Sequence, residues 1–392
     1  MSTAVRVGRF FSRLAVKWKR LPLFARTVYV LTLISFATHV AFYVSPAFAD
    51  LYNATVSTGV RGLLAAVSGL VPFSLAEALL ILVLPLMALL MVYAFRIKEK
   101  EKLQRLLAVV LAFSLLLYNL FVMAFAAGYR GKSLDQKMGI ESLSPSEGED
   151  KALYRTAIWL AEELDTLVPT IDYDAYGASI SPYSFEQATR LLKESYEDIR
   201  RTDGIGTPSV GLAKPVALSH LMSHTHILGV YTFFTGEANV NMSFTDFNTV
   251  YTAAHEMAHQ RGFAREDEAN FMAFLACYNA DDHYLRYAGC WELLRYLLSD
   301  LSSANSVYYT DVCDRIPDEV WGDQARYNAL FAPYRESVAA TVSGAINDTY
   351  LKSQGTAGRV SYRQVVALAV SYFENRVAPT DQSMHQTPAT GV

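Results

Sequence analysis

The amino-acid sequence predicts a mainly helical α+β protein in which an N-terminal unit of three transmembrane helices precedes a larger domain. Three observations support this fold class. Of the 392 residues, 52% are hydrophobic and only 18% are charged, whereas soluble domains average roughly 25% charged residues. Uncharged stretches long enough to cross a bilayer occur only in the first third of the chain. The remainder is more polar, and its most informative segments show helical spacing.

Three segments of the N-terminal unit (residues 1–130) contain no Asp, Glu, Lys or Arg, and they cover about residues 27–49, 78–95 and 106–129. At about 1.5 Å per residue, each is long enough as a helix to cross roughly 30 Å of hydrocarbon. Pro85 in the second segment is compatible with a helix in lipid. We therefore expect a membrane bilayer as a partner. The net charge of −4 gives no reason to expect nucleic acid.

Basic residues predict the orientation of this unit. They precede the first segment with no acidic residue among them, and others fill the loop between the second and third segments. By the positive-inside rule both regions stay in the cytoplasm, so three spans place the rest of the chain outside it. The basic residues are Arg6, Arg9, Arg13, Lys17, Lys19, Arg20 and Arg26, then Arg96, Lys98, Lys100, Lys102 and Arg105.

Two alternatives to this topology remain open at the sequence level. The first apolar segment resembles a secretory signal peptide, with a small-residue cleavage site in residues 45–50. The mildly apolar residues 51–73 are expected to form an interfacial or re-entrant helix, since Gly and Pro interrupt them. A fourth span there would invert the rest of the chain.

Composition divides the remaining chain into three parts. Residues 131–150 are polar and read as a linker, and residues 151–377 form the second domain. Residues 378–392 are rich in Pro, Thr, Gln and Gly and are expected to be a disordered tail. The cysteines Cys277, Cys290 and Cys313 all fall in the second domain, where a bridge between the first two and free buried thiols are both open.

The clearest chemical signal is the run His255-Glu-Met-Ala-His259. Residues four apart project from one face of a helix, so both imidazoles can bind one metal ion. Glu256 lies one step round the helix, where its carboxylate can reach a water on that ion. This spacing is typical of zinc metallopeptidases, so Zn²⁺ is the expected cofactor. The alternative is an amphipathic helix whose histidines bond to carboxylates or carbonyls.

The helix carrying the motif should begin at Thr245 or Asp246 and end at Gly262, because a capping side chain and a C-terminal glycine flank an interior without Pro or Gly. A catalytic zinc usually has three protein ligands. A second helical pattern starts at Glu266, which shares a face with Asn270 four residues later.

We expect Glu266 to bind the metal and Asn270 to support a ligand from behind. Glu268 lies about 200° away on the same helix and remains the less favoured alternative. A third histidine in another known zinc pattern would stand at Arg265, whose guanidinium cannot coordinate a cation.

The run Glu266-Asp-Glu-Ala-Asn270 resembles the glutamate-ligand helix of gluzincins, in which the first Glu is the ligand. Over nearly its whole length, to about residue 375, the chain resembles the bacterial domain-of-unknown-function family 3810. These are membrane-anchored proteins assigned to the zincin-like peptidases. The resemblance implies a zincin-like metallopeptidase domain in a multi-pass protein of a bacterial cell membrane, and it supplies no substrate. The matching segments are Phe234–Asn241, His255–Phe271 and Asn347–Lys352.

A strand is expected just before the motif helix, over residues 236–241. In zincins an edge strand at this place pairs with the extended backbone of the substrate. We therefore expect free backbone groups around Ala238, Asn239 and Val240 to bind a peptide substrate. The alternative is an ordinary interior strand.

Together these features predict a membrane-anchored zinc metalloendopeptidase that hydrolyses peptide bonds outside the cytoplasm. Glu256 is expected to take a proton from a zinc-bound water and pass it to the leaving amine. A donor to the oxyanion could be Tyr231, Tyr350 or His283, and spacing does not select among them. The alternative function is a catalytically silent zincin-fold protein that binds peptide or cell-wall ligands.

Overall fold

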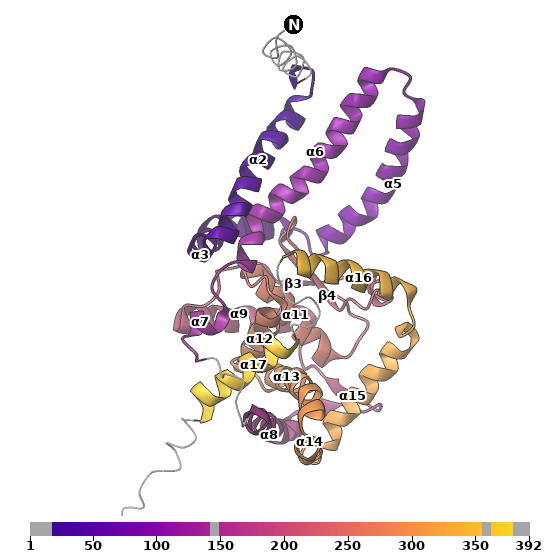
Figure 1. Cartoon of the computed structure of the whole chain (residues 1–392). Coiled ribbons are helices and arrows are strands. Elements are labelled where there is room, and N and C mark those ends of the chain that lie inside the picture. The colour runs from indigo at the N-terminus through magenta and orange to yellow at the C-terminus, as the bar shows by residue number, and fades with distance from the viewer. Residues whose placement is uncertain (1–17, 142–148, 355–361, 379–392) are drawn as a thin grey trace, which may run out of the picture.

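The computed structural model describes residues 18–141, 149–354 and 362–378 (Figure 1). The protein is mainly helical, as predicted. Three long helices extend from one end of the molecule, and the rest of the described chain lies below them (Figure 1). The predicted tail from residue 379 onward and residues 142–148 of the predicted linker lie outside the described residues, as do the first basic residues up to Lys17.

The long helices are α2, α5 and α6, and each is long and apolar enough to cross a membrane. The sequence predicted all three. Each begins before the uncharged segment that predicted it, because the flanking polar and charged residues also favour helix. Pro85 lies inside α5, as expected. The elements of this part are α2 (Leu23–Val44), α3 (Pro46–Tyr52), the π-helix η1 (Asn53–Ser57), α4 (Thr58–Ser68), α5 (Leu75–Arg96) and α6 (Lys100–Ala124).

The segment between α2 and α5 contains short helices, and none of them is among the described helices long enough to span a membrane. The first break comes where the Ser45 side chain accepts a hydrogen bond from the Phe48 amide and Pro46 starts α3. Proline is well suited to a first helical turn, because N–H groups there have no hydrogen-bond partner within the helix and proline has no N–H group. The described residues thus favour the interfacial alternative over a fourth span.

Helices dominate the rest of the chain, and the predicted linker contains one of them, α7. The elements are η2 (Ala126–Tyr129), α7 (Leu134–Met138), α8 (Glu149–Leu167), η3 (Val168–Thr170), β1 (Asp172–Tyr173), β2 (Ser179–Ile180), α9 (Phe185–Asp203), β3 (Ala213–Pro215), α10 (Ser219–Ser223), β4 (Gly229–Thr232), β5 (Glu237–Val240), α11 (Asp246–Gln260), α12 (Glu266–Tyr278), α13 (His283–Ala304), α14 (Ser306–Cys313), α15 (Asp318–Phe331), η4 (Ala332–Tyr334), α16 (Val338–Ser353), α17 (Tyr362–Tyr372) and the π-helix η6 (Phe373–Val377).

The core of this part is built around α11, which packs against α12, α13 and the three-stranded sheet. Nearly every residue of α11 and α12 is buried. Large aromatic side chains fill the space around them, including Phe247, Phe271 and Trp291. The three cysteines are free thiols, so the disulfide alternative is not realised. Close packing of this kind holds the two central helices in one fixed relation.

The order of strands in the larger sheet is β3-β5-β4. β5 is therefore the central strand, parallel to β3 and antiparallel to β4. The prediction that Ala238, Asn239 and Val240 offer free backbone groups to a substrate is wrong, because neighbours on both sides already use them. These residues are almost fully buried. The two outer strands are β3 and β4. β4 consists of the β-branched and aromatic residues that precede β5 in the sequence.

A buried ion pair joins the sheet to the apolar helices. The Glu237 carboxylate accepts hydrogen bonds from the Leu75 and Ala76 amides, at 2.9 and 2.8 Å, and from Lys214 Nζ at 2.7 Å. Lys214 Nζ also donates to the backbone carbonyls of Ser68 and Phe73. Glu237 thus satisfies amides at the N-terminus of α5, where a negative charge is also favoured by the helix dipole.

Replacing Glu237 by alanine should destabilise the full chain by about 3–5 kcal/mol, because Lys214 and two helix amides lose a buried partner. The matched control is Glu186→Ala, which removes an exposed carboxylate paired with Arg190 and should change stability by less than about 0.5 kcal/mol. Denaturant unfolding in detergent measures both. Equal effects of the two substitutions would show that Glu237 does not join the two parts.

Candidate metal centre

Three predicted side chains meet where α11 ends and α12 begins. His255 and His259 come from α11, and Glu266 is the first residue of α12. One ligand atom from each lies within 4.8 Å of the others. Oε2 of Glu266 is 3.2 Å from Nε2 of His255 and 3.9 Å from Nε2 of His259. Among the described residues this is the one group of three or more His, Cys, Asp or Glu placed to hold a metal ion.

The backbone and neighbouring side chains fix the direction of the imidazoles. Nδ1 of His259 lies 2.6 Å from the Phe263 carbonyl oxygen, to which it donates. The proton therefore sits on Nδ1, and the lone pair of Nε2 faces Glu266 and His255. The side chain of Asn270 helps raise the pKa of His255. The supporting role expected for Asn270 stays a prediction.

The charges of the cluster are strongly coupled. Burial lowers the pKa of His259 to about 4, so this imidazole is neutral at pH 7. Burial also opposes the charge on His255, but the hydrogen bond to Glu266 and the charges of Glu256 and Glu266 raise the pKa of His255 to about 9. Burial alone raises the pKa of Glu266, yet the two histidines hold it at about 2. At pH 7 the proton of this pair therefore sits on His255, which forms an ion pair with Glu266.

Glu256 is buried at the side of this cluster, with 5% of its surface exposed. Burial raises the pKa of Glu256 to about 8, and a hydrogen bond from the Tyr231 backbone partly offsets this. The side chain lies against strand β4 so closely that a Cβ on Gly229 would stand 2.6 Å from Oε1 of Glu256. Only glycine leaves room for the carboxylate here. Glu256 is a carboxylate held close to the cluster and outside the His-His-Glu group.

The donor set fits zinc. Two neutral imidazole nitrogens and one carboxylate oxygen are the ligands of many catalytic zinc sites, which keep a fourth position open. The tautomer fixed at His259 leaves its Nε2 free, and the proton on Nε2 of His255 would have to leave for a cation to bind.

Glu268 points elsewhere, as the helical spacing predicted. Its side chain is 2% exposed, and its carboxylate accepts a hydrogen bond from the Leu134 amide of α7 at 2.9 Å. Nε of Arg265 lies 3.5 Å from Oε1 of Glu268, the oxygen that also accepts from Leu134. Burial raises the pKa of Glu268 to about 7, partly offset by Arg265 and Lys137. Glu268 holds the segment after α6 against α12 and contributes nothing to the cluster.

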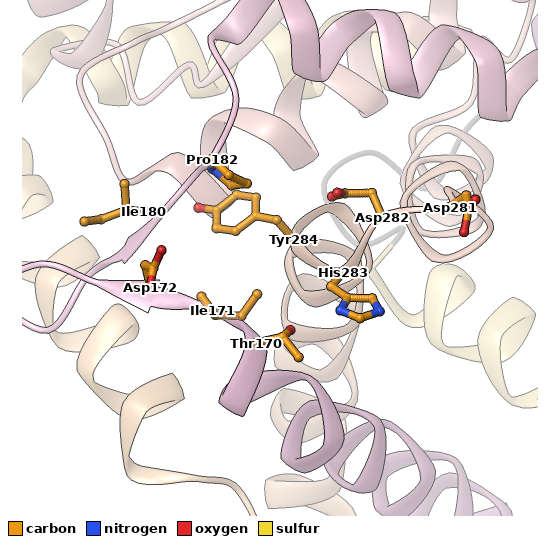
Figure 2. Close-up of a pocket in the computed structure, with 9 residues that line it drawn as sticks. All are labelled: Thr170, Ile171, Asp172, Ile180, Pro182, Asp281, Asp282, His283 and Tyr284. Carbon is orange, nitrogen blue, oxygen red and sulfur yellow. The ribbon is translucent and has the colours of Figure 1, made fainter.

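Of the three candidate oxyanion donors, His283 is distant. It follows α12, a helix of 13 residues and so about 20 Å long, at the end opposite Glu266. Figure 2 shows it in a separate pocket of about 290 Å³ with Asp172 and Tyr284. Tyr231 lies near the cluster, with its ring centre 6.3 Å from that of His259.

Tyr350 of α16 lies beside Glu266, and Tyr129 accompanies it. Their hydroxyl oxygens are 3.1 Å apart. Burial raises the pKa of both hydroxyls, and the charge of Glu266 raises it further. Both groups are therefore protonated at neutral pH and can donate hydrogen bonds. Phe125, at the end of α6, forms the adjoining wall, with its ring centre 5.7 Å from that of His259.

The turn between the metal-ligating helices is held by residues that precede α5. Gly262 has φ of +93°, a conformation that favours glycine. Its carbonyl accepts a hydrogen bond from Nδ2 of Asn53 at 3.0 Å. The buried Arg61 donates to Oδ1 of Asn53, the Ala124 carbonyl and Oγ1 of Thr207, at 2.8, 2.7 and 3.1 Å.

A Cβ on Gly262 would stand 2.8 Å from Nη2 of Arg61 and 2.9 Å from Nδ2 of Asn53. The turn is thus fitted closely to these two side chains. Sequence reasoning missed Asn53, Arg61, Phe125 and Tyr129 as parts of the site. One signal was available, since Arg61 is the sole charged residue between Asp50 and Glu77 in a mildly apolar run.

The protein is thus mainly helical, with three apolar helices long enough to span a membrane and a His-His-Glu group that could hold a metal ion. The chain belongs to the family described as protein of unknown function (DUF3810), which it matches over residues 52–370. The family resemblance expected from the sequence is confirmed. No curated protein and no solved structure matches the chain.

The substitution Arg61→Ala should destabilise the full chain by about 3 kcal/mol, because it removes the donor to several acceptors, including Oδ1 of Asn53 and the Ala124 carbonyl. It should also weaken zinc binding about tenfold, since the turn that spaces His259 and Glu266 loses its support. Arg61→Lys, which keeps the charge but not the planar fork, should fall between. Equilibrium unfolding and competition with a chromophoric zinc chelator measure the two effects.

The control for Arg61 is Arg190→Ala, which removes an exposed arginine paired with Glu186 and should leave both quantities unchanged. A loss of stability in Arg61→Ala without any change in zinc affinity would separate Arg61 from the metal centre.

Zinc affinity should depend on pH. Below a pKa of about 9, His255 carries the proton that a cation must displace, so zinc should bind about tenfold more tightly for each unit of pH rise between 6 and 8. Calorimetry in buffers of different ionisation enthalpy should record release of about one proton at pH 7. A zinc affinity that is independent of pH, with no proton released, would contradict the claim that zinc displaces a proton from His255.

Proposed function

We propose that the protein is a membrane-anchored zinc metallopeptidase. The observation that supports this best is the grouping of His255, His259 and Glu266 with the buried carboxylate of Glu256 beside an unpaired strand edge. A domain that only binds zinc needs the three ligands. A peptide hydrolase also needs a base within reach of the metal and a place for an extended substrate. All three features occur within one small region of the fold.

The proposed substrate edge is β4 rather than β5. The Asn241 amide donates to the Leu228 carbonyl, so in the alternating antiparallel pattern Val230 and Thr232 also direct their backbone groups toward β5. Gly229 and Tyr231 then direct theirs to the outer edge, where no described strand pairs. The Tyr231 amide at this edge bonds to Glu256, so a peptide laid along β4 passes directly beside the base.

The residues then have separate roles. A zinc ion held by His255, His259 and Glu266 supplies a Lewis acid that polarises a carbonyl and acidifies water. Glu256 accepts a proton at its carboxylate and returns it to the leaving amine. A cation beside it favours its ionised form, against the burial that raises its pKa. The hydroxyls of Tyr129 and Tyr350 donate to the developing oxyanion.

The placement outside the cytoplasm is part of the proposal. The basic loop between α5 and α6 contains Arg96, Lys98 and Lys100, at the far end of these helices from α11 and α12 (Figure 1). Because basic loops stay in the cytoplasm, the metal centre belongs on the opposite side of the membrane.

The substitution Glu256→Gln should abolish peptide cleavage, by a factor of about 1,000 or more, because the amide cannot accept the proton. Zinc content should stay at one ion per chain, since Glu256 is outside the ligand set, whereas His255→Ala should lose the zinc. Cleavage of a peptide library and metal analysis measure these outcomes. The full chain must be used, since a fragment starting at residue 151 lacks Asn53, Arg61 and Tyr129.

Wild-type protein that binds zinc and a peptide ligand but cleaves no library member would favour the catalytically silent alternative. Cleavage that survives in Glu256→Gln would reject the assigned base.

A further inference from the structure

Helix α16 has an apolar side that no described residue covers. Val338, Val342 and Ile346 recur every four residues and so lie on one side of the helix. Their exposed fractions are 80%, 55% and 66%. The first charged residue of α16 is Asp348, and it pairs with Lys352 in the next turn. A helix with this surface is unusual in water, where the outer side of a surface helix normally carries charge.

The C-terminal end of α16 lies against the ends of the apolar helices. Tyr350 continues the same four-residue series, and its ring lies 6.2 Å from that of Phe121 in α6. Its hydroxyl lies 3.1 Å from that of Tyr129. At the end of α2, the Tyr43 hydroxyl donates to the Ser353 carbonyl. Figure 1 shows α16 running crosswise to α5 and α6, just below their lower ends.

This position selects lipid as the partner. Because α5 and α6 run across the bilayer, a helix crosswise to them at their ends lies along its surface. The exposed apolar side chains of α16 add to those on α5 and α6, which include Leu80, Leu84 and Phe113. Helices that lie in the interface insert such a side about 5–10 Å into the boundary between headgroups and acyl chains.

We propose that α16 is an interfacial helix, with Val338, Val342 and Ile346 in contact with the lipid of the bilayer on the side of the metal centre. The proposal depends on the apolar helices crossing the membrane and not on any metal chemistry. The proposal also places the metal centre near the membrane surface, because Tyr350 ends the series and lies beside Glu266. One wall of the metal centre then rests on the membrane surface.

Site-directed spin labelling tests this contact in the full chain. Single labels are placed by Val342→Cys and Ile346→Cys in a Cys313→Ser background, since Cys277 and Cys290 are buried. The control is Asn347→Cys, at an exposed position on the opposite side of the helix from Val338. Leu33→Cys, 72% exposed in α2, is the reference for lipid contact.

In phosphatidylcholine vesicles, the ratio of collisions with oxygen to collisions with a water-soluble nickel chelate should be at least about threefold higher at 342 and 346 than at 347. It should approach the ratio at 33. The variants must unfold at the wild-type temperature. Equal ratios at 342, 346 and 347, all below the ratio at 33, would place the apolar side in water. Protection of 342 and 346 from both reagents would assign it to a protein partner or a second copy of the chain. Either result overturns the proposal.

Discussion

The turn around Gly262 sets the spacing of the three side chains that could hold a metal ion. It follows the helix of His255 and His259 and precedes Glu266, and its left-handed glycine fits against Asn53 and Arg61 with no room for a side chain. Arg61 is buried and pairs with no carboxylate among the described residues, so its acceptors in Asn53, Ala124 and Thr207 must be in place for the guanidinium to be tolerated. The ligand geometry therefore depends on residues far earlier in the chain.

This dependence changes the meaning of the N-terminal part. Glu237 and Lys214 join the sheet to the start of α5, and Phe125 and Tyr129 at the end of α6 form walls of the metal centre. The apolar helices are thus more than an anchor for a separable domain. The His-His-Glu cluster and the apolar helices belong to one packed structure.

Much of the local pattern was readable from the sequence. Helical spacing predicted that His255 and His259 share one side of α11, and that Glu266 rather than Glu268 of α12 joins them. The absence of charged residues identified the three apolar helices. Contacts between distant segments were not readable. Strand order decides that Ala238 lies in a central strand, and it depends on which of two neighbouring apolar runs takes the edge. The partners of Arg61 are acceptors from three separate segments, and no local periodicity encodes them.

The central claim is that one cation is held by two imidazoles and one carboxylate at the junction of α11 and α12. X-ray absorption spectroscopy of the zinc-loaded full chain tests it most directly. The account predicts a four-coordinate site with imidazole nitrogen and carboxylate oxygen at about 2.0–2.2 Å, and loss of the imidazole signal in His259→Ala. A shell of oxygen alone, a sulfur ligand, or a spectrum unchanged by that substitution would contradict it.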